Sequence, residues 1–170
     1  MKNFKFGLVF VLFWCISVVK AQQNACACCS ENHNAFDFWV GEWIVTNTDG
    51  SEAGLSVISE IENGCVIKEN WTSIQVGYTG TSYNFYNSKL KRWEQLWVDN
   101  QGQYLKLYGQ KVGNQMILES DEFEAQNGEI LVNRITWTSN EDGTVRQHWE
   151  VLKEGEVNKT LFDGSYTRKK

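Results

Sequence analysis

The sequence contains no proline and only two histidines among its 170 residues. Proline cannot donate to a strand ladder, so a chain without it suits strands whose backbone donors are all in use. The scarcity of histidine disfavours haem and histidine-based metal sites. The motifs G-x-S-x-G and H-E-x-x-H and a glycine-rich phosphate loop are missing as well. The sequence therefore indicates no required cofactor and argues against the enzyme classes that these motifs mark.

The chain also lacks an excess of positive charge. It has 16 lysines and arginines against 21 acidic residues, a formal net charge of -5. Proteins that follow a phosphate backbone carry a basic stripe, and no cluster of that kind occurs in this sequence. We therefore expect no nucleic-acid partner.

One long hydrophobic run is present, at the N-terminus. Lys2 and Lys5 precede an apolar stretch at residues 6–19, and Val19-Lys20-Ala21 fits a small-residue cleavage site. The stretch is shorter than the roughly 20 residues with which a helix spans a bilayer. The pattern predicts a signal peptide at residues 1–21 and an exported protein, periplasmic or secreted, with no membrane span after signal removal.

The remaining chain divides into a cysteine-containing leader at residues 22–30 and a stretch at residues 31–170 of single-domain size. Ser30 opens a segment that fits the N-cap of a short helix running to Phe38. A helix at this position would close one end of the domain.

Turn signals then cut the chain at nearly regular intervals. Several are Asn-Gly or Asp-Gly pairs, which suit two-residue hairpin turns between antiparallel strands. Nine connections predict ten strands. The connections lie at residues 49–50, 63–64, 76–80, 87–91, 99–102, 111–114, 127–128, 142–143 and 153–156.

The expected architecture is all-β, a ten-stranded antiparallel up-and-down barrel with a short N-terminal helix. Closing such a sheet removes its hydrophobic edges. A two-sheet sandwich is the alternative, and short connections without a Greek-key crossover favour the barrel. Barrel diameter grows with strand number, so ten strands leave room for a cavity.

Several segments share a likeness to one family. They are residues 36–43 (FDFWVGEW), 69–71, 84–86, 93–99, 136–138 and 162–166. On these segments the chain resembles, over residues 36–168, a bacterial family of exported lipocalin-like, calycin-type proteins of unknown function. The resemblance implies a ligand-holding barrel and carries no catalytic residues. In calycins a Gly-x-Trp on the first strand packs under an arginine of the last strand, and Gly41, Trp43 and Arg168 match those partners.

Alternation along the expected strands places the less polar residues inside the barrel. The inward set is rich in aromatic rings with a few polar groups, as small-molecule sites are. The predicted ligand-binding residues are Trp71, Tyr83, Phe85, Trp93, Trp97, Trp137 and Trp149 as walls, with Glu69, Gln95 and Gln147 as polar anchors. Alternatively, these rings simply fill the barrel.

Glu69 is the sharpest of these predictions. In a dry interior its pKa should rise, unless a ligand hydroxyl or amine meets it. A shift of one residue in the inward assignment would place Asn70 inside instead. The predicted function is non-catalytic binding of a small apolar or aromatic ligand. An enzyme that uses Glu69 in the cavity is an alternative.

Cys26, Cys28 and Cys29 form a C-x-C-C cluster with His33 close behind. Thiolates at this spacing could hold copper or zinc, with His33 or Cys65 completing the ligand set. An oxidising compartment favours disulfides instead, and four cysteines outside the signal allow three pairings. We favour disulfides, with one bridge from the leader to Cys65, and keep metal binding as a second functional hypothesis.

A haem site would need a proximal histidine that faces the barrel interior. His33 precedes the barrel, and His148 is expected to point outward beside Arg146 and Glu150. Haem binding is therefore disfavoured.

Overall fold

The computed structural model of the protein describes residues 26–170. The predicted signal peptide at residues 1–21 and the start of the leader lie outside the described residues. The described chain contains two short 3-10 helices, η1 (His33–Trp39) and η2 (Glu62–Gly64). Its strands are β1 (Gly41–Asn47), β2 (Glu52–Ile61), β3 (Val66–Ser73), β4 (Thr79–Asn87), β5 (Arg92–Asp99), β6 (Tyr104–Val112), β7 (Gln115–Glu119), β8 (Phe123–Glu124), β9 (Ile130–Ser139), β10 (Val145–Lys153) and β11 (Glu156–Arg168).

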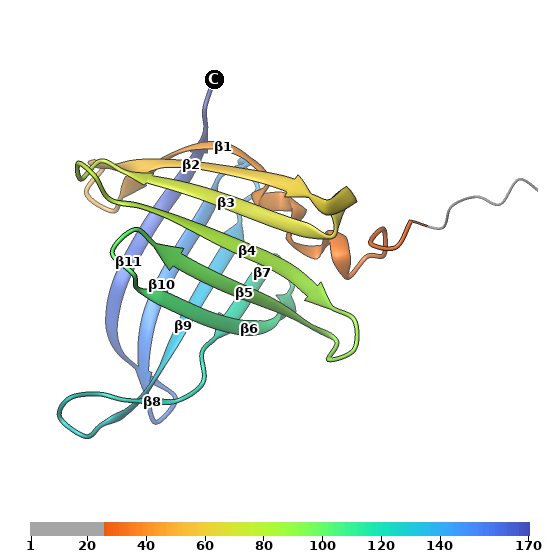
Figure 1. Cartoon of the computed structure of the whole chain (residues 1–170). Coiled ribbons are helices and arrows are strands. Elements are labelled where there is room, and N and C mark those ends of the chain that lie inside the picture. The colour runs from red at the N-terminus through yellow and green to blue at the C-terminus, as the bar shows by residue number, and fades with distance from the viewer. Residues whose placement is uncertain (1–25) are drawn as a thin grey trace, which may run out of the picture.

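Ten of these strands form a closed antiparallel barrel in chain order (Figure 1). β11 returns to pair with β1, with Trp43 opposite Arg168, and this pairing closes the ring. The predicted ten-stranded up-and-down barrel is confirmed and is consistent with a calycin-like fold. The extra strand is β8, which lies in the connection between β7 and β9. It pairs with the start of β9 and projects beyond the barrel (Figure 1).

The hairpin turns follow from their Asx chemistry. At the turn between β1 and β2, the Asp49 carboxylate accepts a hydrogen bond from the Ser51 amide at 2.9 Å, and Gly50 adopts a φ of +83°. Asp142 repeats this arrangement with the Thr144 amide at 3.0 Å. Side-chain acceptors of this kind stabilise tight turns, so the strand boundaries are set locally.

The predicted N-terminal helix is present as the 3-10 helix η1, which begins at His33 and ends at Trp39, one residue beyond the expected end at Phe38. The backbone carbonyl of Ser30 accepts from the His33 amide at 2.9 Å. Phe36 and Trp39 are fully buried. The Phe36 ring lies 5.2 Å from the ring of Trp137, between ring centroids, so η1 plugs one end of the barrel as expected.

The Gly-x-Trp and arginine partners meet at the same end. The Arg168 guanidinium lies 4.1 Å from the centroid of the Trp43 ring, as in a cation–π contact. Its Nη1 also donates to the Val40 carbonyl at 2.7 Å. Gly41 has a φ of +145°, and a Cβ there would lie 1.8 Å from Arg168 Nη1. The absence of a side chain at Gly41 thus makes room for the arginine.

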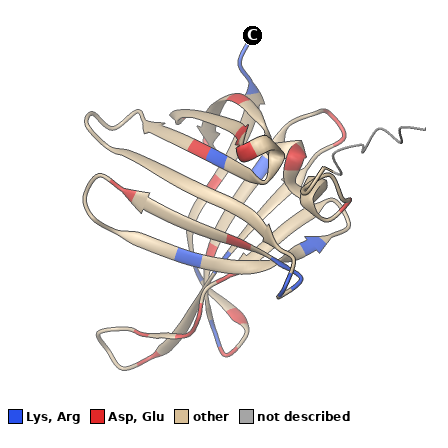
Figure 2. Ribbon diagram, turned by 45° about the vertical axis from the view of Figure 1, so that its right-hand side comes forward, with Lys and Arg blue, Asp and Glu red and all other residues tan. Residues whose placement is uncertain are grey.

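Along the ribbon in Figure 2, lysines and arginines lie scattered among acidic residues and form no long basic run. Arg146 makes two 2.7 Å hydrogen bonds to the Asp163 carboxylate. His148 lies between Gln147 and Trp149, which both line the barrel cavity, so strand alternation places His148 on the outer face as expected. Within residues 26–170, no helix is long and apolar enough to cross a membrane.

Candidate functional site

A cavity of about 430 Å³ occupies the barrel interior. Trp137 lines it and contacts Phe36 of η1, which places η1 beneath the cavity. Asn47 and Ile74 also line it, and they lie where β1 and β3 end, away from η1. The Ile74 side chain is 62% exposed, so the mouth of the cavity opens at that end.

Most of the predicted ligand-binding residues line this cavity. They are Glu69, Trp71, Gln95, Trp97, Trp137, Gln147 and Trp149. The structure adds lining residues beyond the predicted ligand-binding set. These additional lining residues are Asn47, Ala53, Ser73, Ile74, Gln75, Tyr78, Leu105, Ile135, Leu161, Phe162 and Tyr166.

The inward orientation predicted for Tyr83 and Phe85 is wrong. Tyr83 is 44% exposed, whereas its neighbours Ser82 and Asn84 are completely buried. On the outer face, Tyr83 lies opposite Lys68, whose ammonium is 5.9 Å from the ring centroid. Polar residues occupy the inside of β4 because a buried carboxylate on β3 requires hydrogen-bond donors there.

Trp93 points inward as expected but does not line the cavity. Its ring packs edge-on against Phe36 at 5.6 Å between centroids. Its Nε1 donates to the Asn32 carbonyl at 3.0 Å. Trp93 therefore belongs to the plugged end of the barrel, together with η1.

The buried carboxylate is that of Glu69. Its Oε1 accepts a hydrogen bond from Ser56 at 2.8 Å, and its Oε2 accepts one from Ser82 at 3.0 Å. Asn84 donates to the Ser82 hydroxyl at 3.0 Å and accepts from Gln95 Nε2 at 2.6 Å. These five residues form one polar network across β2, β3, β4 and β5.

This network leaves the Glu69 carboxyl with neutral partners only. Burial raises the pKa of Glu69 from its ordinary value of 4.5 to about 7, and the hydrogen bonds from Ser56 and Ser82 offset part of the rise. Burial and the charge of Glu69 also raise the pKa of Tyr166. The Tyr166 hydroxyl donates to Gln147 Oε1, so a second polar pair lies in the same cavity.

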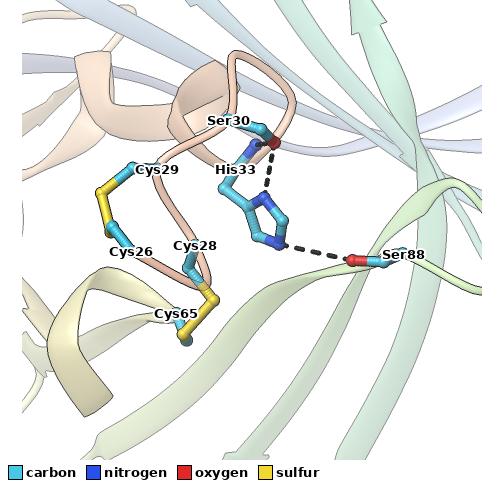
Figure 3. The surroundings of a disulfide bond; sticks show 7 residues. All are labelled: Cys26, Cys28, Cys29, Ser30, His33, Cys65 and Ser88. Atoms are coloured by element: carbon cyan, nitrogen blue, oxygen red, sulfur yellow. Dashed lines mark hydrogen bonds between the residues drawn. A yellow bond between two sulfur atoms is a disulfide. The ribbon is translucent and has the colours of Figure 1, made fainter. Parts of the chain in front are cut away.

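The cysteines form two disulfides, Cys26–Cys29 and Cys28–Cys65 (Figure 3). The expected bridge between the leader and Cys65 is confirmed. His33 lies nearby, with Nδ1 2.6 Å from the Ser30 hydroxyl and Nε2 3.4 Å from the Ser88 hydroxyl (Figure 3). Metal binding at this cluster would require reduction of the disulfides, because thiolates are the ligands.

Ser56 and Ser82, which hold the Glu69 carboxyl, and Tyr166 are among the candidate-site residues that sequence reasoning missed. The signal for the serines was Glu69 itself, since a buried carboxylate needs donors on the strands beside it. Register was the missing information: Glu69 lies opposite Ile58 on β2 and opposite Ser82 on β4. Tyr166 could have been found from the alternation of β11.

No protein-family model matches the chain, and no curated protein matches it either.

Proposed function

We propose that this protein is an exported barrel that binds a small apolar or aromatic molecule in its interior without transforming it. The observation that carries the proposal is the 430 Å³ cavity walled by Trp71, Trp97, Trp137 and Trp149. Small-molecule sites are concave, mostly apolar and about 300–1,000 Å³ in volume, with a few polar groups that orient the ligand. Glu69 and its neighbours are polar groups of that kind.

The shape of the interior supports binding over simple core filling. Phe36 and Trp39 of η1 already fill the plugged end, while the indoles further along the barrel line open space. A core packed to normal density leaves few voids larger than a water molecule. A cavity of this size, with a mouth beside Ile74, is suited to binding a small-molecule ligand.

Export has separate support. Two disulfides suit an oxidising compartment, since cytosolic thiols are kept reduced. The predicted signal peptide and the resemblance to exported lipocalin-like proteins point the same way. These features support the proposal that the protein acts in the periplasm or outside the cell.

Native mass spectrometry of the protein purified gently from its own host tests the binding function. We expect a non-covalent organic mass that is lost on denaturation. Ala53→Phe should abolish this mass, because Ala53 is buried and lines the cavity. Leu55→Phe is the matched control on the same strand, since Leu55 is 37% exposed on the outer face and should leave the mass unchanged.

Two results would contradict binding in the cavity. One is retention of the mass by the folded Ala53→Phe variant. The other is a clean protein mass together with no uptake of apolar compounds by the purified barrel.

An enzyme that uses Glu69 is the second candidate, favoured by one observation. The carboxyl has a pKa of about 7 and shares the cavity with Tyr166, and general acid–base groups work best with a pKa near the operating pH. This candidate predicts that the bound compound is converted over time and that Glu69→Gln binds it without conversion. Recovery of the unchanged compound from the native protein would exclude it for that compound.

A further inference from the structure

Glu69 is the one carboxyl among the described residues that line the cavity. Each of its oxygens accepts a single hydrogen bond, from Ser56 or from Ser82. A carboxylate can accept about four such bonds, so lone pairs remain for a donor that enters the cavity. Neither serine brings a charge that would balance an ionised carboxylate.

The walls do not supply that charge either. Among the described residues that line the cavity there is no lysine, arginine or histidine. The other titratable lining groups are Tyr78 and Tyr166, and burial raises the pKa of both, which keeps their hydroxyls neutral. An anionic ligand would therefore meet no counter-charge and one like charge, and burying an unpaired charge is costly.

The aromatic walls favour the opposite sign. Trp71, Trp97 and Trp149 line the same cavity as Glu69. The face of an indole ring attracts cations more strongly than the other aromatic side chains do, and the attraction grows when the site is desolvated. A carboxylate that shares one cavity with several indoles forms a site for a positively charged group attached to an apolar body.

Resting on the proposed binding function, we propose that the ligand is an organic amine, whose protonated nitrogen donates to the Glu69 carboxylate while its apolar or aromatic body lies among the indoles. The ammonium supplies the counter-charge that the protein lacks at this carboxyl. The charge of the Glu69 carboxylate and the volume of the cavity together set the ligand class. The ligand is a cation small enough to fit in about 430 Å³.

Proton release gives this inference its own signature. In the ligand-free protein the pKa of Glu69 is about 7, so near neutral pH a large fraction of the molecules carry a proton on this carboxyl. An ammonium ligand stabilises the carboxylate and expels that proton. A neutral hydroxyl ligand expels none, because it can accept a hydrogen bond from the protonated acid.

Three probes that share one indole body test the charge preference: tryptamine, tryptophol and indole-3-propionate, which are cationic, neutral and anionic at neutral pH. Isothermal titration calorimetry should show tryptamine binding at least tenfold more tightly than tryptophol at pH 8. Indole-3-propionate should bind at least tenfold more weakly than tryptophol. At pH 7, titrations in phosphate and Tris, which differ in ionisation heat, should show a fraction of a proton released with tryptamine.

Glu69→Gln is the test variant, because the amide keeps the shape of the side chain and removes its charge. We expect it to lose at least tenfold in tryptamine affinity, to release no proton and to hold tryptophol within about twofold. Glu60→Gln is the matched control on the same sheet, since Glu60 is exposed and does not line the cavity, and it should behave as the wild type. Tryptophol binding also shows that the Glu69→Gln barrel is folded.

The outcomes separate this inference from the proposed function. If tryptophol binds and tryptamine binds no better, or if Glu69→Gln leaves the preference unchanged, the amine inference is overturned and cavity binding stands. If none of the three binds and native mass spectrometry finds no organic occupant, both fail. If none binds but an occupant is found, a basic nitrogen in that occupant supports the inference and its absence overturns it.

Discussion

Glu69 shows at the scale of one residue how burial and function are linked. The side chain is held between two serines in the barrel interior, at the cost of burying a carboxyl group. Such a group is more stable protonated than ionised unless a partner arrives. The burial that motivates the proposed cationic ligand therefore also makes the stability of the ligand-free barrel depend on pH.

The sign of this dependence follows from the raised pKa. The folded state holds the Glu69 proton more tightly than the unfolded chain, because the pKa rises from 4.5 to about 7 on folding. The stabilising contribution is complete below pH 4.5 and is lost as the pH rises through about 7. The full effect is on the order of 3 kcal/mol.

We therefore expect the ligand-free wild type to lose up to about 3 kcal/mol more unfolding free energy than Glu69→Gln between pH 5 and pH 8. Urea unfolding of both proteins at the two pH values measures the difference, and the variant corrects for all other titrating groups. Equal pH profiles for the two proteins would contradict the burial of an ionisable carboxyl at Glu69.

A second residue-scale prediction concerns Gly41 and Arg168. Gly41→Ala would place a methyl group against Arg168 Nη1, and the flexible guanidinium would have to leave the Trp43 ring and the Val40 carbonyl. Arg168→Ala removes the same contacts directly. We expect Arg168→Ala to lose about 1–2 kcal/mol of unfolding free energy, and Gly41→Ala to lose more, because the φ of +145° at Gly41 is one that residues with a side chain rarely adopt.

A double-mutant cycle measured by urea unfolding checks this coupling. Because both changes remove one shared interaction, the double variant should lose clearly less than the sum of the single losses. Strict additivity would mean that the glycine does not serve to admit the arginine.

At the scale of elements, η1 and the leader are held to the barrel in two ways. Packing holds η1, since Phe36 and Trp39 are fully buried. A covalent bond holds the leader, since Cys28–Cys65 spans 37 residues and joins it to the chain between η2 and β3. The second bridge, Cys26–Cys29, spans three residues and constrains only the leader itself.

The two bridges should therefore differ in their effect on stability. In the chain-entropy account, closing a loop of this length is worth roughly 3–4 kcal/mol, and a very short loop is worth much less. We expect Cys28→Ser with Cys65→Ser to lower the unfolding free energy by about 2–4 kcal/mol, and more than Cys26→Ser with Cys29→Ser does. Urea unfolding of both double variants measures this, and equal losses would contradict the tethering role of Cys28–Cys65.

At the scale of the whole molecule, the closed ring is the main structural feature. β1 and β11 would be exposed edges in an open sheet, and here they pair with each other from Trp43 to Asn47. β8 is different, since its two residues pair with β9 outside the ring. Closure leaves the ring strands without an unpaired edge.

Hydrogen exchange followed by NMR checks closure directly. Amides of β1 and β11 in the paired stretch should exchange as slowly as those of β3, in the middle of the sheet, and the amides of β8 should exchange much faster. Rapid exchange along β1 and β11 would indicate an open barrel in solution.

The sequence alone determined the features that depend on neighbouring residues. The turns at Asp49-Gly50 and Asp142-Gly143 are set by side chains within two residues, so the strand count and the meander were predictable. The likeness to calycins likewise identified Gly41, Trp43 and Arg168 as partners. The disulfide between the leader and Cys65 followed from cysteine number and the expected compartment.

Only the tertiary structure decided which residues face the cavity. On β4, alternation by hydrophobicity favoured Tyr83 inside, but Ser82 is inside because it donates to Glu69 from the next strand. Trp93 and Trp97 share one face of β5, yet Trp93 packs on η1 and Trp97 lines the cavity. Alternation identifies the face of a strand, whereas partners across strands and height along the barrel arise only when the sheet closes.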